Sequence, residues 1–305
     1  MQHDQRPRMP STMRKIVPSK FLLPIVFLIF ALATPPIALA DSGSAGLDLI
    51  PPPPGANNWS CRPSSEHPRP VVLAHGTFEN RLDNWIMVSP ALAQAGYCVF
   101  ALDYGKTVGG ALSGIGPMAA SAREISDFVD RVLSATGARQ VDIVGHSQGG
   151  MLPRYYLKNL GGAAKVNALV GLAPDNHGTT WGVINLPITI APPVTAAVCP
   201  SCVEQLATSE FIRQLNSGGE VLPGIKYTVV SSRTDEFATP YTTGFLTPGP
   251  DVTNILLQDV CPGDVTEHML LTSDPVAIRL VRNALDPDHA VAPTCAAVQV
   301  GPAGI

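Results

Sequence analysis

The chain has 305 residues, with 20 basic and 24 acidic side chains, a formal net charge of -4 and 45% hydrophobic residues. High hydrophobic content with few charges excludes an intrinsically disordered protein, and the lack of a basic excess argues against an electrostatic nucleic-acid binder. The length allows one large domain or two small ones.

Residues 1–40 have the three parts of a secretory signal peptide. A basic start is followed by an apolar run and then by the small-residue end Ala38-Leu39-Ala40. An uncleaved membrane anchor is the alternative, but prolines inside and after the apolar run would break its helix. We therefore expect cleavage after Ala40 and a secreted, extracellular protein, and retention in the cell envelope stays open.

Cleavage would leave a clearly acidic protein with no second segment able to span a membrane. Residues 1–40 hold five basic groups and one acid, so 15 basic and 23 acidic residues remain, with a net charge of -8. Residues 41–60 contain Pro51-Pro52-Pro53-Pro54 and predict a linker in polyproline II conformation. We expect a single domain over residues 61–305.

All six cysteines lie after the leader, and an even number in an exported protein indicates three disulfides. Spacing alone does not choose among the possible pairings. Cys199-Pro-Ser-Cys202 is a candidate redox or zinc motif, but no second Cys or His pair has metal-ligand spacing, which favours a local disulfide. The six residues are Cys61, Cys98, Cys199, Cys202, Cys261 and Cys295.

From about residue 70, short apolar runs alternate with longer amphipathic segments. This alternation predicts an α/β protein, with a mostly parallel sheet covered by helices on both faces. The predicted strands are 71–74, 97–102, 141–144, 166–172, 227–231 and 254–257. One predicted helix ends near 96, and three others cover 119–135, 151 to about 160, and 275–285.

Residues 178–222 interrupt this alternation. Their apolar, proline-rich first part, residues 181–198, is expected to form an insertion over the sheet edge. A hydrophobic flap of this kind suits an apolar substrate.

Gly145-His146-Ser147-Gln148-Gly149 matches the G-x-S-x-G pattern of a nucleophile elbow. The predicted strand before it and the predicted helix after it supply the context that the pattern requires. Such a turn presents Ser147 above the sheet at a helix N-terminus, where N–H groups favour developing negative charge. A glycine-rich turn whose serine only caps a helix is the alternative. We expect Ser147 to be a nucleophile.

A serine nucleophile needs a base, and the base needs an orienting acid. In strand–elbow–helix enzymes the chain order is Ser, then acid, then His. Of the three histidines after Ser147, His289 lies in a proline-rich tail and His177 follows the fourth strand too early. His268 follows the last predicted strand and is therefore the expected base.

The acid should follow the strand before the one that leads to His268. Strand 227–231 runs into Asp235 and Glu236. Asp235 is closer to the strand end, and Asp is the more common third member of such triads. We therefore expect Asp235 to orient His268, with Glu236 as the alternative.

The oxyanion of a tetrahedral intermediate needs two preset donors. One is expected to be the backbone N–H of Gln148, directly after the nucleophile. The other is expected in the loop His75-Gly76-Thr77, which follows strand 71–74. The amide of Thr77 can face the site from there, and its hydroxyl offers a further donor.

Patterns for other chemistries are weak. Residues 114–119 formally match the dinucleotide pattern G-x-G-x-x-[GA], but no predicted strand runs into them. The sequence holds no Walker motif and no H-E-x-x-H motif. We therefore expect neither a cofactor nor a metal in the chemistry.

Together these residues resemble the secreted actinobacterial lipases of the α/β-hydrolase fold that are related to Candida antarctica lipase B. The resemblance spans roughly residues 60–295. It rests on His75-Gly76-Thr77, Ser147-Gln148-Gly149-Gly150, Leu172-Ala173-Pro174-Asp175, Thr234-Asp235-Glu236, and Cys261 followed by His268.

The resemblance implies a triad of Ser147, Asp235 and His268, with Thr77 and Gln148 as oxyanion donors. It also implies the disulfides Cys61–Cys98 and Cys261–Cys295, which leaves Cys199 and Cys202 as a local pair. Residues 181–222 do not match the fungal lipase closely, so chain-length preference is not implied.

We predict a secreted serine carboxylester hydrolase, a triacylglycerol lipase that forms an acyl-enzyme. The alternatives are a short-chain esterase, an acyltransferase to cell-envelope acceptors, and a non-catalytic hydrolase-like binding protein, which the presence of all three triad candidates disfavours. The expected partner is a lipid or ester substrate, and an oil–water interface is one place where the protein could meet it. We expect no nucleic-acid partner, no transmembrane segment after cleavage, and a monomer.

Overall fold

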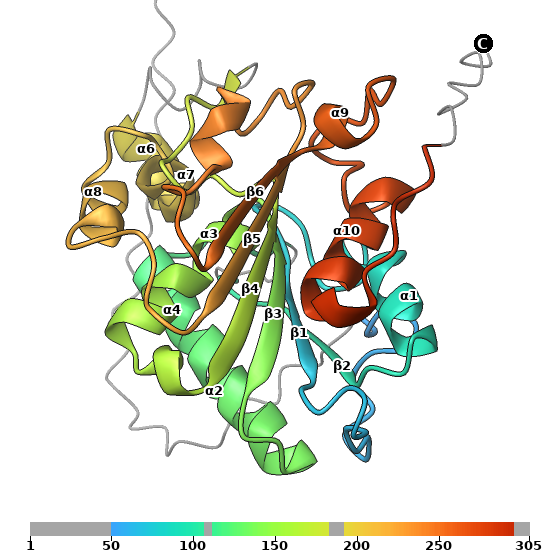
Figure 1. Cartoon of the computed structure of the whole chain (residues 1–305). Coiled ribbons are helices and arrows are strands. Elements are labelled where there is room, and N and C mark those ends of the chain that lie inside the picture. Colours follow the sequence, from blue (N-terminus) through green and yellow to red (C-terminus); the bar gives the residue numbers. More distant parts are fainter. Residues whose placement is uncertain (1–49, 107–111, 183–191, 296–305) are drawn as a thin grey trace, which may run out of the picture. The chain divides into compact units, whose positions relative to one another are not determined.

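Six parallel strands form one sheet in the computed structural model, which describes residues 50–106, 112–182 and 192–295 (Figure 1). All of them belong to the second of two structural units, residues 48–305. The expected signal peptide, 1–40, lies outside the described residues. In chain order the strands are β1 (Val71–Ala74), β2 (Val99–Leu102), β3 (Val141–His146), β4 (Val166–Leu172), β5 (Lys226–Ser231) and β6 (Val252–Leu256), and their spatial order is β2-β1-β3-β4-β5-β6.

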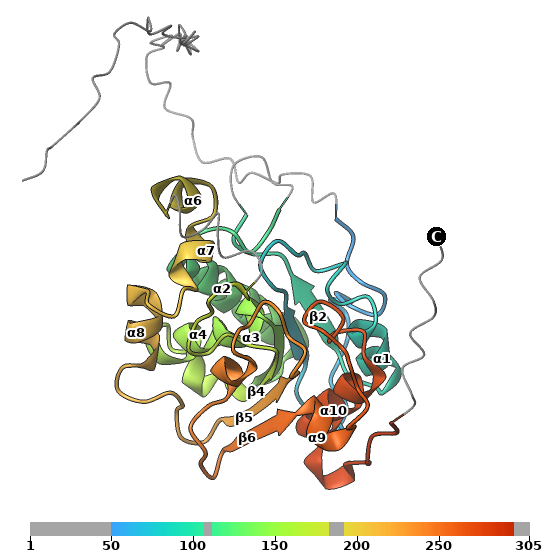
Figure 2. The ribbon, with the colours of Figure 1, turned by 90° about the horizontal axis from the view of Figure 1, so that it is seen from above.

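The sheet is buried on both faces, which explains why its strands are continuous apolar runs rather than alternating ones. Successive side chains of a strand point to opposite faces, so Val72 packs into one core cluster and Leu73 into the other. Helices α2 (Met118–Thr136) and α4 (Pro153–Asn159) cover the first face, and α1 (Val88–Gln94) and α10 (Pro275–Leu285) cover the second (Figure 2). The predicted α/β class with a mostly parallel sheet is confirmed.

The helices differ from the sequence predictions mainly at their ends. The helix expected from 151 begins at once after Ser147 and is divided before Pro153, giving α3 (Gln148–Met151) and α4. A proline cannot donate to the preceding turn, so it starts a new helix. The remaining helical segments are η1 (Gly162–Ala164), α6 (Pro192–Val198), α7 (Pro200–Glu204), α8 (Glu210–Asn216), η3 (Tyr241–Gly244), α9 (Leu257–Val260) and η4 (Pro287–His289).

The second half of the expected linker, 41–60, is part of the folded unit. Ala56 forms a parallel bridge with Val99, and the Asn57 side chain both donates to the carbonyl of Ala101 (2.9 Å) and accepts from its N–H (2.8 Å). The Trp59 ring lies 5.0 Å from that of Phe100. The segment therefore extends the edge of the sheet beside β2, and the described fold begins before residue 61.

Three disulfides join Cys61 to Cys98, Cys199 to Cys202 and Cys261 to Cys295, which is the pairing that the resemblance implied. The first fixes the segment before β1 to the start of β2. The third links the end of α9 to the C-terminal segment. No helix in the described ranges has the length and apolar character that crossing a bilayer requires.

The interruption between β4 and β5 contains α6, α7 and α8. Residues 183–191 of the expected flap lie outside the described residues. Trp181, at its start, is buried against Ile115 and the Cys199–Cys202 disulfide. Helix α6 buries none of its side chains. The apolar sequence of the interruption therefore forms a small core at α7, whereas α6 stays exposed.

Candidate active site

The loops that follow β1, β3, β5 and β6 carry the candidate residues. Because all strands are parallel, their carboxyl ends lie at the same edge of the sheet, where open α/β sheets bind ligands. A pocket of about 520 Å³ lies there and is lined by Thr77, Ser147 and His268 together. The fold thus brings three sequence-predicted residues, up to 191 positions apart in the chain, to one cavity.

Ser147 occupies a sharp turn between β3 and α3. Its φ of 53° is a conformation that residues other than glycine rarely adopt, as expected for a strained nucleophile elbow. Its N–H donates to the carbonyl of Leu172 (2.8 Å), which fixes the elbow to β4. A Cβ on Gly149 would lie 2.0 Å from the carbonyl oxygen of Ala74. Only glycine allows α3 to pack this closely on β1.

His268 and Asp235 form a buried pair. Nδ1 of His268 lies 2.8 Å from Oδ2 of Asp235. The other oxygen of Asp235 accepts the N–H groups of Phe237 (2.9 Å) and Ala238 (2.7 Å). A carboxylate fixed in this way holds the His268 ring in one orientation and leaves Nε2 as the proton acceptor.

The other candidates that follow Ser147 have different partners. Glu236 contacts the side chain of Glu267 and the backbone of His268, whereas the His268 ring pairs with Asp235. His177 contacts the carboxylate of Glu220 at 2.9 Å. His289 pairs at the surface with Asp286, which precedes it by three residues, also at 2.9 Å. Of the acids considered for the triad, Asp235 is therefore the one whose carboxylate contacts the His268 ring.

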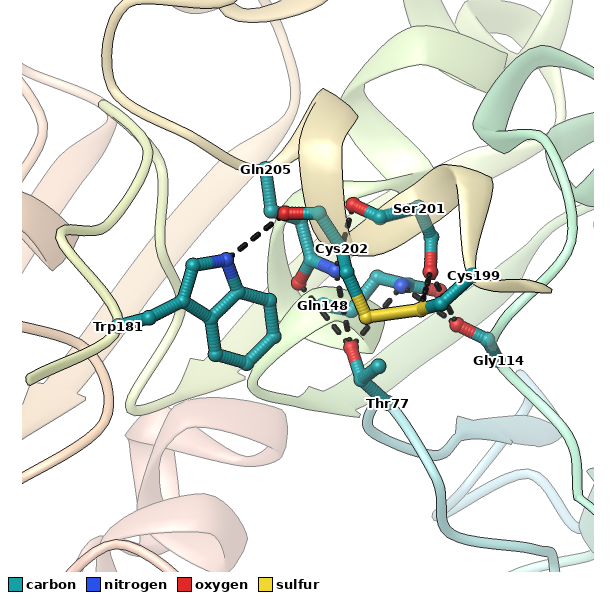
Figure 3. The surroundings of a disulfide bond; sticks show 8 residues. All are labelled: Thr77, Gly114, Gln148, Trp181, Cys199, Ser201, Cys202 and Gln205. Atoms are coloured by element: carbon teal, nitrogen blue, oxygen red, sulfur yellow. Dashed lines mark hydrogen bonds between the residues drawn. A yellow bond between two sulfur atoms is a disulfide. The ribbon is translucent and has the colours of Figure 1, made fainter. Parts of the chain in front are cut away.

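The loop after β1 passes close to the elbow. A Cβ on Gly76 would lie 3.2 Å from Cβ of Ser147, so a larger residue would crowd the nucleophile. The hydroxyl oxygen of Thr77 accepts a hydrogen bond from Nε2 of Gln148 at 3.0 Å (Figure 3). The backbone N–H of Gln148 is the first of α3 and has no acceptor within its helix. Both expected oxyanion donors thus lie beside Ser147.

A buried acid–histidine pair behind the elbow escaped the sequence analysis. Oε2 of Glu79 lies 2.9 Å from Nδ1 of His146. Burial alone would lower the pKa of His146, but the Glu79 carboxylate outweighs it and the pKa is raised. Burial likewise opposes ionisation of Glu79, but His146 lowers the pKa of that carboxyl. No pattern in the sequence joins Glu79 to His146, since their partnership arises only when β1 lies beside β3.

Asp175 is a second group whose environment the sequence did not reveal. It follows β4 at the same sheet edge, and in the part of the chain that the structure describes neither of its carboxylate oxygens has a hydrogen-bond partner. Burial, reinforced by the nearby charge of Asp235, raises the pKa of Asp175 to about 7. In the sequence, the feature that could have marked Asp175 as a candidate site residue was its position at the end of a predicted strand.

Apolar side chains form much of the pocket wall. Several of them are also exposed to solvent, including Phe78, Met269 and Leu270 at 44%, 44% and 57%. The rest of the wall consists of Glu79, Asp83, Trp181, Phe237, Thr272 and Ser273. The pocket therefore combines an exposed apolar rim with polar side chains that include the proposed site residues.

Solved structures share this fold, which is that of the α/β hydrolases. Lipase B of Aspergillus fumigatus superimposes with a TM-score of 0.63 at 21% identity, over 80% of this chain and 57% of that one. The mature form of Bacillus licheniformis lipase BlEst2 gives a TM-score of 0.55 at 12% identity, over 73% and 94%. At these identities the likeness concerns the fold alone.

Residues 68–281 match the family described as Lipase (class 2). The chain belongs to the class 2 lipase family. It is 35% identical over 91 residues to triacylglycerol lipases of Pseudarthrobacter phenanthrenivorans and Burkholderia plantarii, a match that covers 28% of this chain and 27% and 24% of theirs. The match thus spans about a quarter of the length of these relatives. The expected resemblance to lipases is confirmed.

Proposed function

We propose that the protein is a serine carboxylester hydrolase in which Ser147 is the nucleophile, His268 the base and Asp235 the orienting acid. One observation carries the proposal. His268, held 2.8 Å from Asp235, lines the same pocket as Ser147, which occupies a strained elbow. Membership of the class 2 lipase family supports the same reaction.

In the first half of the reaction, Nε2 of His268 takes the proton of Ser147 as the Oγ atom attacks the ester carbonyl. The new C–O bond gives a tetrahedral intermediate whose oxyanion is held by the Gln148 N–H and by Thr77. The intermediate collapses as His268 gives its proton to the leaving alcohol. An acyl-enzyme on Ser147 remains.

In the second half, water takes the place of the alcohol. His268 accepts a proton from the water as it attacks the acyl-enzyme carbonyl, and then returns this proton to Ser147 as the acid leaves. Throughout, Asp235 accepts the hydrogen bond from Nδ1 and stabilises the positive charge that His268 carries transiently. The residues named supply all proton transfers of the cycle, so the proposal needs no cofactor.

We further propose that the substrate is a lipid ester, a triacylglycerol in particular. The apolar pocket and its exposed rim of Phe78, Met269 and Leu270 suit an acyl chain presented at an oil–water interface. The relatives named triacylglycerol lipase support this choice over a short-chain esterase or an acyltransferase. The three disulfides support export, because such bonds persist in oxidising compartments.

The test is hydrolysis of p-nitrophenyl esters by the protein, by Ser147→Ala and by the surface control Ser217→Ala. We expect Ser147→Ala to lose activity by about 10⁴-fold or more and Ser217→Ala to keep it. Full activity of Ser147→Ala would contradict the proposed mechanism.

The substrate class is tested by comparing acyl chains from acetate to oleate, below and above the solubility limit of each ester. A lipase predicts high activity on long chains and a rise in rate when the ester forms a separate phase. Activity confined to soluble short-chain esters would favour the esterase alternative.

A further inference from the structure

The short helix α7 lies directly against the proposed oxyanion loop. The Cys199–Cys202 disulfide closes its first turn, and both cysteines are buried (Figure 3). The carbonyl of Cys202 accepts a hydrogen bond from the indole N–H of Trp181 (2.8 Å). The hydroxyl of Ser201 donates to the carbonyl of Gly114 (2.7 Å). The turn is thus fixed on two sides, independently of Thr77.

Gln205, the residue that ends α7, faces the Thr77 hydroxyl. Its backbone N–H donates to the carbonyl of Ser201 (2.9 Å), and its own carbonyl accepts the N–H of Thr179 (2.8 Å). Its side chain is 1% exposed. Both the oxygen (3.1 Å) and the nitrogen (3.0 Å) of the side-chain amide lie within hydrogen-bond distance of Oγ1 of Thr77.

The orientation of this amide follows from a third contact. Nε2 of Gln205 also lies 3.0 Å from the backbone carbonyl of Ser201. A carbonyl oxygen only accepts, so the amide nitrogen must be the atom on that side. Gln205 therefore offers the Thr77 hydroxyl one donor and one acceptor at the same time.

These contacts determine where the proton of the Thr77 hydroxyl can point. A hydroxyl oxygen accepts two hydrogen bonds and donates one. Nε2 of Gln148 (3.0 Å) and Nε2 of Gln205 (3.0 Å) can fill both acceptor positions. The hydroxyl then has one proton to donate, and because Thr77 lines the pocket that holds Ser147, an oxyanion there can accept it. Without an oxyanion present, Oε1 of Gln205 can take this proton instead.

We propose that Gln205 is a positioning residue that orients the Thr77 hydroxyl toward the oxyanion, and that the Cys199–Cys202 disulfide keeps Gln205 in place by closing the first turn of the short helix that Gln205 ends. The inference rests on the proposed function, since it presupposes an oxyanion at Ser147. It assigns a function to the segment between β4 and β5 that contains α7. Gln205 acts only through Thr77 and touches no reacting atom.

A double-mutant cycle with Gln205→Leu and Thr77→Val tests this role, because only residues that act together depart from additivity. Gln205→Leu should lower kcat about tenfold with little change in KM, whereas Thr77→Val should lower it about 100-fold. In the Thr77→Val background, Gln205→Leu should have no further effect. An equal tenfold loss in both backgrounds would overturn the proposal.

The matched control is Gln214→Leu, which changes an exposed glutamine on the next helix, α8. It should keep wild-type kcat. Thermal unfolding of each variant shows that a lowered kcat belongs to folded protein. A kcat for Gln205→Leu equal to that of the control would also overturn the proposal.

The disulfide is tested with Cys199→Ser/Cys202→Ser. We expect this serine pair to lower kcat, but by no more than Gln205→Leu does. Adding Gln205→Leu to the serine pair should give the same total loss of kcat as Gln205→Leu alone. Wild-type kcat in the serine pair would overturn the role of the disulfide.

Ser147→Ala, measured beside these variants, reports on the proposed function separately. If Ser147→Ala is inactive but the effect of Gln205→Leu is additive with that of Thr77→Val, only the Gln205 proposal fails. If Ser147→Ala keeps its activity, both fail.

Discussion

Nε2 of His146 lies 3.1 Å from the backbone carbonyl oxygen of His268, so the residue before the proposed nucleophile holds the backbone of the proposed base. On its other side, Nδ1 of His146 contacts Glu79 at 2.9 Å. Both ring nitrogens donate when the imidazole is protonated. One buried histidine thereby ties together the loop after β1, the elbow after β3 and the loop that carries His268.

The Glu79–His146 pair predicts that the loss of stability caused by Glu79→Gln depends on pH and is largest within a defined pH range. The contribution of Glu79, whose pKa is lowered, is present above its ordinary value of 4.5 and is lost as pH falls through the folded-state value. The contribution of His146, whose pKa is raised, is present below its ordinary value of 6.5 and is lost as pH rises through the folded-state value. Glu79→Gln should therefore destabilise most between these two pH values, by about 3 kcal/mol.

Urea unfolding of Glu79→Gln at acid, intermediate and alkaline pH checks this expectation. Glu66→Gln, at an exposed position, is the control and should change little. A destabilisation by Glu79→Gln that stays the same at every pH would show that the pair is not ionised in the folded state.

A second prediction separates the two adjacent acids. Asp235→Asn should lower kcat about 10⁴-fold, because an amide in this place no longer orients Nδ1–H or stabilises the imidazolium. Glu236→Gln should leave kcat close to that of the wild type, since the His268 ring pairs with Asp235 and Glu236 contacts only the backbone of His268 and the side chain of Glu267. Steady-state hydrolysis of a p-nitrophenyl ester compares them, and a larger loss with Glu236→Gln would reverse the assignment of the acid.

A third prediction concerns the unpartnered carboxyl of Asp175. With a folded-state pKa of about 7 against an ordinary 3.8, the folded protein binds a proton that the unfolded chain has lost, so its stability falls as pH rises between these values. Above pH ~7 the loss of stability caused by ionising the buried Asp175 carboxyl is fully present. Relative to wild type, Asp175→Asn should therefore be more stable by about 3 kcal/mol at pH ~8 than at pH ~5.

Denaturant unfolding of wild type and Asp175→Asn at the two pH values measures this difference directly. Because all other titrating groups are common to both proteins, their effects cancel. An unchanged difference between pH ~5 and pH ~8 would mean that Asp175 is already ionised, with a partner, in the folded protein.

The parts of the fold that follow from local pattern could be predicted from the sequence. The run Val141 to Val144 and the spacing of Ile125, Val129 and Val132 give a buried strand and an amphipathic helix, as the structure has them. The nucleophile elbow was recognisable for the same reason. Its glycines and its flanking elements lie within one short stretch of chain.

The contacts that depend on strand order could not be predicted. Glu79 meets His146 because β1 lies beside β3, and Gln205 meets Thr77 because α7 packs on the loop after β1. Neither pair has a sequence spacing that marks it. The expected linker was misjudged for a related reason, since only the presence of β2 shows that Asn57 and Trp59 have a partner.

The most direct test of the account is covalent labelling of the folded protein with a fluorophosphonate, followed by mass spectrometry of the peptides. The account predicts one adduct, on Ser147, because only an activated serine beside a base attacks such a reagent. Ser147→Ala should take up no label, and Asp235→Asn should be labelled far more slowly. A folded protein that takes up no label, or that carries the adduct on another residue, would contradict the proposed catalytic site.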